Sequence, residues 1–481
     1  EYFRNGSTAT TTDWKVNPIP EDLLTRRVEI TGPVNSAKMV INMLSRNESG
    51  SRADCAMLDF EDSMNPTWDN VMNGFKNLSE ACDGTLQYIK KNKSGAIEKI
   101  YRLNPNDMPV IMVRCRGLHL NESNITVDGE PISGGMLDLA GSFYHTAKKL
   151  IAQGKTPKYY VPKCEHYLEA RWWNKLFSAL EDALKVERGT LKATFLIETL
   201  PAAYQMEEIL YEYREHAAGL NGGRWDKIFS DIKVLKYHPD RIMADRGTID
   251  MKKHWMDNYV KRIIKVCHSH GAFAMGGMSA FTPGKDAATR KEQTDKVIAD
   301  KSYEAFIGHD GCWVSHPYFI EYAMKSFSRK NQLDVLLEEF DKYPDLAPQG
   351  GTPRTIAGLR TNIRVGIAYM QGWNAGNGCV SWDNLMEDLA TLEISRAQVW
   401  QWLFHQVKTD DGEKVTCELV SKIFNEELDK IKEEIKDNMF AADDEAVKRV
   451  IASYEKAKKD AENIFLSKNF NEFLFTQNEL V

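Results

Sequence analysis

Eight short apolar runs, separated by amphipathic stretches, are the feature that most limits how this chain can fold. Gly, Pro or Asn punctuates most of the separating stretches, as is typical of helices flanked by turns. Strands that alternate with helices predict an α/β fold with a parallel sheet, and eight of them favour a closed (β/α)8 TIM barrel over an open sheet. The predicted strands are Val28–Val34, Ala56–Glu61, Pro109–Cys115, Lys158–Pro162, Thr194–Glu198, Lys227–Ile232, Ala272–Gly276 and Cys312–His316.

The strand pattern divides the chain into unequal parts. Residues 1–13 are polar and Thr-rich, which predicts a mobile N-terminal tail. Residues 14–317 carry the barrel, and the polar, Gly-rich segment at about 117–143 is predicted to be an elaboration inserted into it. After Pro317 the strand pattern stops. Helical patterns dominate residues 318–481, so a helical C-terminal domain is expected.

Composition excludes several classes of protein. The chain is 42% hydrophobic with a formal charge of −7, which argues against nucleic acid as the main partner, because phosphate binding needs clustered Lys and Arg. The eight cysteines form no CxxC pair and no zinc-type spacing with His, a pattern typical of reduced thiols in an intracellular protein. No apolar run reaches the roughly 18 to 20 residues of a spanning helix, so no membrane partner is expected.

The stretch Ala193–Phe229 carries two carboxylates that we expect at one rim of the barrel. An apolar run ends in Glu198, a helical pattern follows from Pro201, and the glycines within 219–223 precede an extended segment beyond Asp226. Adjacent strands of such a β/α repeat would place Glu198 and Asp226 side by side, and hard oxygen ligands of this kind suit Mg²⁺. Each acid alone could equally be a helix N-terminal charge or a turn residue.

Other polar side chains follow the predicted strands at the same rim, where barrel enzymes build their active sites. A run of acids in a partly desolvated site needs a compensating cation. The acids could instead form a surface loop with a helix N-cap, and the arginines could make a structural salt bridge to them. These residues are Asp59, Glu61 and Asp62 in LDFEDS, Arg114 and Arg116 in VRCRG, Lys163 in VPK and His316 in VSHP.

One more acid lies outside the barrel pattern. Asp388 stands in a Gly- and Asn-rich entry to a helix, in the string GNGCVSWDNLMEDLATLEISRAQVWQW. A carboxylate at such a junction can be a simple cap. It can also be a general base that the C-terminal domain brings to the barrel mouth, closing the site against water. The spacing leaves both interpretations open.

The string REHAAGLNGGRWDKIF at residues 214–229 resembles the signature of the malate synthase family. Further strings agree with that family in order, from about Trp14 to the C-terminus, and they resemble its shorter A-type isoform. The similarity begins just before the first barrel strand, so we expect the N-terminal helical segment of A-type enzymes to be missing or trimmed. The strings are RRVEITGPV, LDFEDSMNPTWDN, VRCRGLHLNE, DGEPISG, YVPKCEHYLEARWWN, ATFLIET, DRGTIDM, CHSHGAFAMGGMSAF, GCWVSHP and NLMEDLATLEISRAQVWQW.

This resemblance implies an acyltransferase that converts the acyl group to alkyl on transfer. The implied reaction is a Mg²⁺-dependent Claisen condensation of acetyl-CoA with glyoxylate, followed by thioester hydrolysis to malate and CoA, a step of the glyoxylate bypass of the tricarboxylic acid cycle. By position, Glu198 and Asp226 resemble the metal ligands of the family. Arg114 resembles its catalytic arginine and Asp388 its catalytic base, which the C-terminal domain would supply.

Substrate contacts are also implied by the resemblance. Gly223, Trp225 and Asp226 would face glyoxylate, whose carboxylate the backbone amides after GLNGG could bind. Pro283, in the FTPGK turn at 281–285, and Met386, in NLMED, would lie on the acetyl-CoA side, and Lys163 is a further candidate for it. A surface-loop role is at least as consistent with the sequence for Lys163 and for the turn.

Departures from the family pattern leave every implied ligand and catalytic group in place. Lys227 stands where Tyr is usual, Cys115 interrupts an Arg-Pro-Arg pattern, and SWD at 381–383 replaces a more apolar triplet. These changes bear on CoA contacts and on charge at the rim. A malyl-CoA-type lyase on the same barrel is one alternative, against which the NLMED segment argues. A non-catalytic CoA-binding paralogue is another, and it predicts loss of site residues that are present.

The sequence constrains the cellular location and the oligomeric state less than it constrains the fold. The chain ends in Glu-Leu-Val rather than in Ser-Lys-Leu, so a cytoplasmic location is predicted, with the glyoxysome or peroxisome as the alternative. A monomer is expected.

Overall fold

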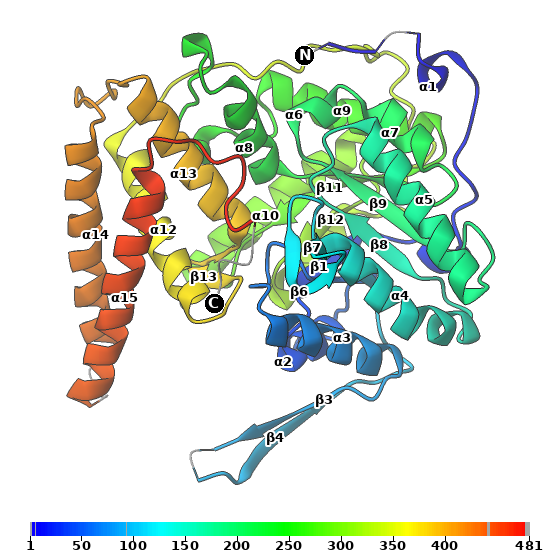
Figure 1. Cartoon of the computed structure of the whole chain (residues 1–481), viewed down its shortest axis with the longest axis horizontal. Coiled ribbons are helices and arrows are strands. Elements are labelled where there is room, and N and C mark those ends of the chain that lie inside the picture. Colours follow the sequence, from blue (N-terminus) through cyan, green and yellow to red (C-terminus); the bar gives the residue numbers. More distant parts are fainter. Residues whose placement is uncertain (1, 5, 93, 440–442, 477–481) are drawn as a thin grey trace.

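The computed structural model describes residues 1–481 except 1, 5, 93, 440–442 and 477–481, and its centre is a closed barrel of parallel strands (Figure 1). The predicted (β/α)8 barrel is therefore confirmed. Around the barrel the order is β1 (Val28–Pro33), β2 (Cys55–Asp59), β5 (Val110–Arg114), β8 (Lys158–Val161), β9 (Lys192–Ile197), β10 (Ala217–Gly222), β11 (Phe273–Ser279) and β12 (Gly311–Val314), which pairs with β1.

Seven of the eight predicted strands overlap a barrel strand, and the prediction of a strand at Lys227–Ile232 was wrong. That segment lies inside helix α8 (Arg224–Leu235), and the sixth strand is the preceding β10. β10 contains small residues because a Cβ on Gly219 would lie 2.2 Å from the carbonyl oxygen of Phe273 in β11. A strand of small residues carries no apolar run. The sequence pattern therefore indicated the next apolar segment, Lys227–Ile232, as the strand. Asp226 consequently lies in the first turn of α8.

An outer ring of helices covers the barrel (Figure 1). α9, rather than α8, packs against β10 and β11, while α11 packs against β1 and β12, so the barrel packing continues beyond Pro317. The helical pattern that follows from Pro201 forms two short helices, the second of which ends at Glu212, and β10 begins at Ala217. The ring contains α2 (Ala37–Met43), α3 (Trp68–Cys82), α4 (Gly134–Ala152), α5 (Tyr167–Leu184), α6 (Leu200–Ala203), α7 (Met206–Glu212), α9 (His254–Ser269), α10 (Ala287–Ile307) and α11 (Ile320–Ser326).

Three peripheral pieces decorate the barrel. A hairpin of β3 (Gln87–Lys91) and β4 (Ile97–Arg102) projects from it at the bottom of Figure 1. The segment at about 117–143, expected as an elaboration, forms a second hairpin and then the first half of α4; its strands are β6 (Asn121–Val127) and β7 (Glu130–Ser133). In the N-terminal tail, α1 (Thr8–Thr11) is preceded by Ser7, whose hydroxyl donates to Glu208 on α7.

The C-terminal part has its own apolar core. Its helices pack on one another, and α13 packs against α8 of the barrel. Short 3-10 turns occur at Glu21–Leu23, Pro239–Arg241, Arg246–Thr248 and Pro317–Phe319. None of the helices that the structure describes is long and apolar enough to cross a membrane. The C-terminal elements are α12 (Ile356–Asn374), a hairpin of β13 (Val380–Trp382) and β14 (Leu385–Glu387), α13 (Leu389–Phe404), α14 (Cys417–Asn438) and α15 (Asp444–Phe465).

A buried polar cluster, which we call the floor network, lies beside an apolar cluster that includes Met57, Met112 and Leu196. Arg26 is its centre: Nε donates to Glu29 over 2.8 Å, and the two terminal nitrogens donate to Thr194 and Tyr160 over 3.0 and 2.9 Å. Trp313 Nε1 donates to the other oxygen of Glu29 over 3.0 Å. Every charge in this network has a partner of opposite sign or a hydrogen bond.

Candidate active site

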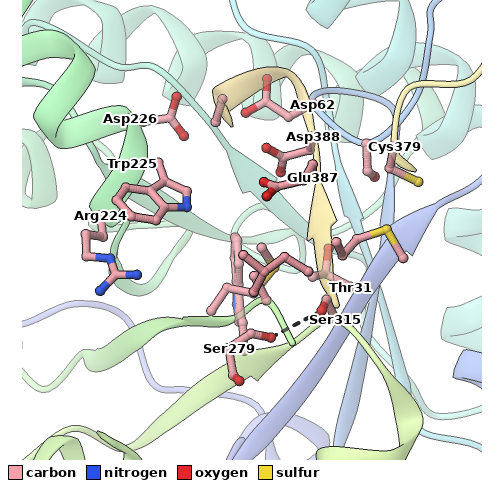
Figure 2. A pocket seen from close by; sticks show the side chains of 18 of the residues that line it. Thr31, Asp62, Arg224, Trp225, Asp226, Ser279, Ser315, Cys379, Glu387 and Asp388 are labelled. Carbon is pink, nitrogen blue, oxygen red and sulfur yellow. Dashed lines mark hydrogen bonds between the residues drawn. The ribbon is translucent and has the colours of Figure 1, made fainter. Parts of the chain in front are cut away.

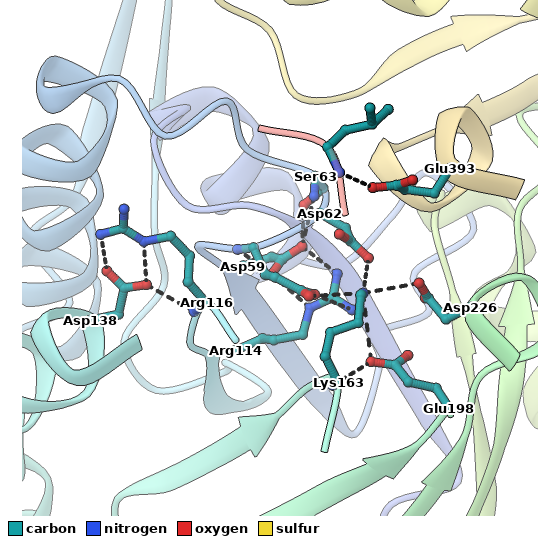
Figure 3. A network of polar contacts seen from close by, with 12 residues as sticks. Asp59, Asp62, Ser63, Arg114, Arg116, Asp138, Lys163, Glu198, Asp226 and Glu393 are labelled. Atoms are coloured by element: carbon teal, nitrogen blue, oxygen red, sulfur yellow. Dashed lines mark hydrogen bonds and ion pairs between the residues drawn. The ribbon is translucent and has the colours of Figure 1, made fainter. Parts of the chain in front are cut away.

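A second charged cluster lies at the C-terminal rim of the barrel, and we call it the rim cluster (Figure 3). Its members come from the ends of four strands, from the first turn of α8 and from the start of α13, because the C-terminal ends of parallel strands meet at one face. If all are ionised, six acids face two cations. They are Asp59, Glu61, Asp62, Glu198, Asp226 and Asp388, with Arg114 and Lys163.

Arg114, at the end of β5, is held in one orientation by the adjacent strand. Its Nε and a terminal nitrogen donate to the two oxygens of Asp59 over 2.7 and 2.5 Å, and its other terminal nitrogen lies 3.3 Å from Glu61. Asp59 in turn accepts from the Ser63 hydroxyl over 2.6 Å. Burial would raise the pKa of Asp59, but the charge of Arg114 and these hydrogen bonds outweigh it, so the pKa lies below its ordinary value. Both partners are therefore charged.

Arg116, two residues further along, faces away from the rim cluster. Its guanidinium pairs with Asp138 at 2.9 Å (Figure 3). It also pairs with Glu122 at 3.0 Å. Of the two arginines in VRCRG, the structure thus brings only Arg114 to the LDFEDS acids. Residues i and i+2 of a strand face the same side, but β5 ends at Arg114. Arg116 lies beyond the strand, so its side chain can face elsewhere.

Lys163, just beyond β8, places its ammonium among four carboxylates. Its Nζ lies 2.8 Å from Asp62, 2.9 Å from Glu61, 3.0 Å from Asp226 and 3.6 Å from Glu198. Burial would lower the pKa of Lys163, but the charges of Asp226 and then Asp62 outweigh it and raise the pKa. The ammonium is therefore protonated and compensates part of the acidic charge.

Glu198 and Asp226 meet at the N-terminus of α8, so the expectation that they share one rim agrees with their positions. Burial first, and then the charge of Asp226, raise the pKa of Glu198 to about 8. Gly223 permits this approach, because a Cβ there would lie 2.8 Å from Glu198 Oε2. The amide of Gly223 donates to the Tyr259 hydroxyl over 3.2 Å, so it is already engaged. The following first-turn amides of α8 have no intrahelical acceptor.

The chemistry of these donors fits a hard divalent cation. Both oxygens of Glu61 and Oδ1 of Asp226 are buried, and among the described residues they meet cations only as ion pairs, with Lys163 at 2.9 and 3.0 Å and with Arg114 at 3.3 Å. No three acidic, His or Cys side chains in the described part of the chain are grouped tightly enough to hold a metal by themselves. A Mg²⁺ site needs fewer, since this ion is often bound through one or two carboxylates with water and substrate completing its shell. Glu198 and Asp226 could supply such a pair.

Asp388 reaches the barrel through the β13–β14 hairpin. The amide of Met386 donates to the carbonyl of Ala280 over 2.7 Å, and the amide of Leu389 donates to the carbonyl of Asp62 over 3.1 Å. These bonds fix the hairpin to the rim. Burial, followed by the charges of Asp62 and Asp226, raises the pKa of Asp388 to about 8. A carboxyl with such a pKa can gain or lose a proton near neutral pH.

A cavity of about 650 Å³ joins these residues, and barrel and C-terminal segments both line it (Figure 2). Of the catalytic, metal-binding and substrate-binding residues that the family resemblance implied, its described lining leaves out Pro283, although Phe281 of the same turn is present. A volume of this size is typical of a small-molecule site. The implied residues in the lining are Arg114, Glu198, Gly223, Trp225, Asp226, Met386 and Asp388, and Asp62 of the rim cluster lines it as well.

Two arginines in the cavity wall were missed by the sequence reasoning. The guanidinium of Arg224 lies 4.2 Å from the ring of Trp225, and that of Arg246 lies 5.2 Å from it. Burial lowers the pKa of both. Arg224 adjoins Trp225 in the sequence, which was a usable signal. Arg246 stands in the DRGTIDM string, where nothing in the local pattern indicates the fold that brings it to Trp225.

Fold and site together define a class. A (β/α)8 barrel with an acidic rim, a fixed arginine and a carboxyl contributed by an attached helical domain has the architecture of a barrel enzyme, and side chains of these types suit general acid–base chemistry.

Sequence comparisons identify the family within that class. Residues 110–341 match the description "Malate synthase, TIM barrel domain" and residues 353–477 match "Malate synthase, C-terminal". Malate synthase A of Escherichia coli (strain K12) is 47% identical over 437 residues, covering 89% of this chain and 80% of that protein. Malate synthase of Myxococcus xanthus is 46% identical over 472 residues (96% and 83%), and the glyoxysomal malate synthase of Candida tropicalis 42% over 445 residues (90% and 78%).

The chain therefore belongs to the malate synthase family and is an enzyme that condenses acetyl-CoA with glyoxylate. The four residues whose loss a silent paralogue would predict, Arg114, Glu198, Asp226 and Asp388, all line the cavity.

Proposed function

We propose that Arg114 and Asp388 activate acetyl-CoA in this cavity while Glu198 and Asp226 hold Mg²⁺ and glyoxylate beside them. One observation carries the proposal: a fixed arginine from the barrel and a carboxyl of raised pKa from the C-terminal domain line the same cavity as two buried carboxylates. Malate synthase chemistry needs these groups together, since it joins a thioester methyl to an aldehyde.

Proton abstraction is the step that the chain's own residues must make easier. A thioester methyl is a very weak acid, so its proton leaves at neutral pH only if the enolate is stabilised as it forms. Asp388 accepts the proton as general base, and a pKa near 8 makes it a stronger base than an ordinary aspartate. Arg114, oriented by its paired bonds to Asp59, presents a fixed positive charge to the enolate oxygen.

Glyoxylate binding is assigned to the start of α8. Its carboxylate would accept from the first-turn amides, which the helix dipole also favours, and Trp225 would cover it on one side. When bound, Mg²⁺ would polarise the aldehyde and orient the oxo acid. The enolate carbon then attacks the aldehyde carbon, and water cleaves the resulting thioester to give malate and CoA.

The acetyl-CoA side of the cavity is assigned to Met386 and to the neighbourhood of Phe281. The hairpin carrying Met386 pairs with the chain at Phe281 through an isolated bridge to Leu385. Acetyl-CoA that enters the cavity here would bring its thioester toward Asp388, the residue that follows β14. The same hairpin would close the site, and a dry cavity strengthens the interaction of Arg114 with developing charge.

The test is a coupled assay that follows free thiol released from acetyl-CoA with glyoxylate, with and without Mg²⁺. We expect release that depends on Mg²⁺ and that falls by about 10²- to 10⁴-fold in Asp388→Asn. Asp383→Asn is the matched control: Asp383 lies on the same hairpin, pairs with Arg364 at 2.9 Å and has φ 47°, which asparagine tolerates. Unchanged turnover in Asp388→Asn would sink the assignment of the base.

We also propose a monomer in the cytoplasm, with the glyoxysome as the alternative location. The bacterial relatives carry no organelle in their names, whereas those of Candida tropicalis and Gossypium hirsutum are named glyoxysomal. Light scattering should give a mass close to 54.8 kDa, and twice that value would exclude the monomer. Fractionation of the source cells would decide the location.

A further inference from the structure

Lys163 has a position that the proposed reaction does not explain. Its ammonium is buried and lies within 3.0 Å of three carboxylates, those of Asp62, Glu61 and Asp226, with Glu198 at 3.6 Å. Two of the four, Glu198 and Asp226, are the proposed ligands of Mg²⁺. A monovalent cation carried by the chain therefore shares its oxygens with the divalent cation that the reaction needs.

The backbone at Lys163 supports a specific role for this arrangement. Its φ is 56°, in the left-handed region that non-glycine residues rarely adopt. This conformation allows the amide of Lys163 to donate to Glu198 Oε1 over 2.8 Å while its side chain lies beside the same oxygen. Strained backbone of this kind persists where the surroundings hold it, and it is concentrated at functional sites.

We propose that Lys163 is a positioning residue whose ammonium competes with Mg²⁺ for Glu198 and Asp226 and so keeps metal binding weak and reversible. This inference rests on the proposed function, which assigns those two acids to the metal. Asp226 Oδ1, 3.0 Å from Nζ, is the oxygen for which the two cations compete most directly. Two positive charges cannot share it at close range without strong repulsion.

Glu61 and Asp62 provide the position to which the ammonium would withdraw. They lie 2.9 and 2.8 Å from Nζ, and neither is a proposed metal ligand. The lysine side chain has a flexible four-carbon stem, so a small movement toward this pair would release Asp226 without leaving the charge unpaired. The four acids would then be divided between two cations, with Glu61 and Asp62 on the ammonium and Glu198 and Asp226 on the metal.

The inference is tested by titrating the full-length, substrate-free protein with Mg²⁺ in a calorimeter, after removal of bound metal with a chelator. Lys163→Met removes the competing charge and keeps a stem of similar length. We expect it to bind Mg²⁺ at least about tenfold more tightly than the wild type, since a like charge within a few ångströms is lost. Lys163→Arg keeps the charge and should bind Mg²⁺ as weakly as the wild type. Damage to the site would instead weaken binding in both variants.

Lys158→Met is the matched control, because Lys158 is also buried and begins β8, the strand that Lys163 follows, and it pairs with Asp22 at 2.5 Å. Its Mg²⁺ affinity should equal that of the wild type. If Lys163→Met does not fold, Lys163→Gln, which keeps a hydrogen-bond donor without the charge, should show the same tightening. Equal or weaker binding in the uncharged variant overturns the inference.

Glu198→Gln in the same titration distinguishes failure of the proposed function from failure of the inference about Lys163. Loss of Mg²⁺ binding there supports the assignment of the metal ligands, whatever Lys163 does. Retained binding would contradict that assignment and, with it, competition at Glu198. Because no substrate or turnover enters the measurement, an error in the roles of Arg114 or Asp388 leaves its outcome unchanged.

Discussion

The floor network and the rim cluster are two buried charged groups inside the same barrel, and they differ in charge balance. In the floor network, Arg26 faces Glu29, and Thr194, Tyr160 and Trp313 complete their hydrogen bonds. In the rim cluster, six acids share two cations, and Lys163 alone lies within 3.6 Å of four of the acids.

This difference in charge balance indicates that the floor network stabilises the fold and that the rim cluster serves the reaction. Balanced charges can be buried only if each finds a partner, and the floor network then needs nothing from outside the chain. An excess of buried negative charge destabilises the fold unless a cation or a polar substrate binds to it. Loss of a floor charge should therefore reduce stability, whereas changes at the rim should act mainly on activity.

The largest effect is expected on breaking the floor network. Arg26→Met leaves Glu29 buried without its cation and should lower the free energy of unfolding by about 3–5 kcal/mol. Urea denaturation would measure this, and kcat of the folded protein should stay near the wild-type value. The double variant Arg26→Met with Glu29→Gln should recover part of the loss. A large fall in kcat without a change in stability would contradict the structural role.

At the rim, Arg114→Lys should lower kcat by about 10²- to 10³-fold, because lysine keeps the charge but loses the paired geometry on Asp59. The free energy of unfolding should change little. Arg116→Lys is the control, since Arg116 faces Asp138 and Glu122 instead, and it should affect stability more than the rate of thiol release. Equal kcat losses in both variants would show that orientation toward the cavity does not matter.

A smaller effect is expected in the pH profile. Asp388, the proposed base, can act only when deprotonated. We therefore expect kcat/KM to fall as the pH drops through its pKa, which burial, Asp62 and Asp226 raise to about 8 in the substrate-free protein. Asp62→Asn removes one repelling charge and lowers that pKa. The acidic limb of the profile should move to lower pH by about one unit. A limb that stays in place or moves to higher pH would be inconsistent with this coupling.

The smallest effect is expected for an ion pair that belongs to neither cluster. Arg171 and Glu212 are 2.7 Å apart near the surface, with the arginine side chain about half exposed. Arg171→Ala should change the free energy of unfolding by less than about 1 kcal/mol, because water screens the pair. A much larger loss in urea denaturation would show that burial is not what distinguishes the two internal clusters.

Local patterns predicted the parts of this structure that depend on neighbours in the sequence. Seven strands were found because each carries a short apolar run, and Glu198 was placed because it follows one of them. β10 was missed because close packing against Phe273 requires Gly219, which leaves no apolar run to detect. The hairpin of β3 and β4 was also missed, since its mostly exposed residues carry no buried face.

The amino-acid sequence by itself determined the barrel, its attached helical domain and, through the family strings, which acids and which arginine are proposed for the site. Their chemistry is a property of the residue types. Tertiary structure decided which charges meet: Arg114 turns to Asp59 while Arg116 turns to Asp138, and Asp388 is brought to the rim by hydrogen bonds between distant segments. It also placed Lys163 among four acids. Such contacts depend on distances between segments far apart in the chain, which local periodicity does not contain.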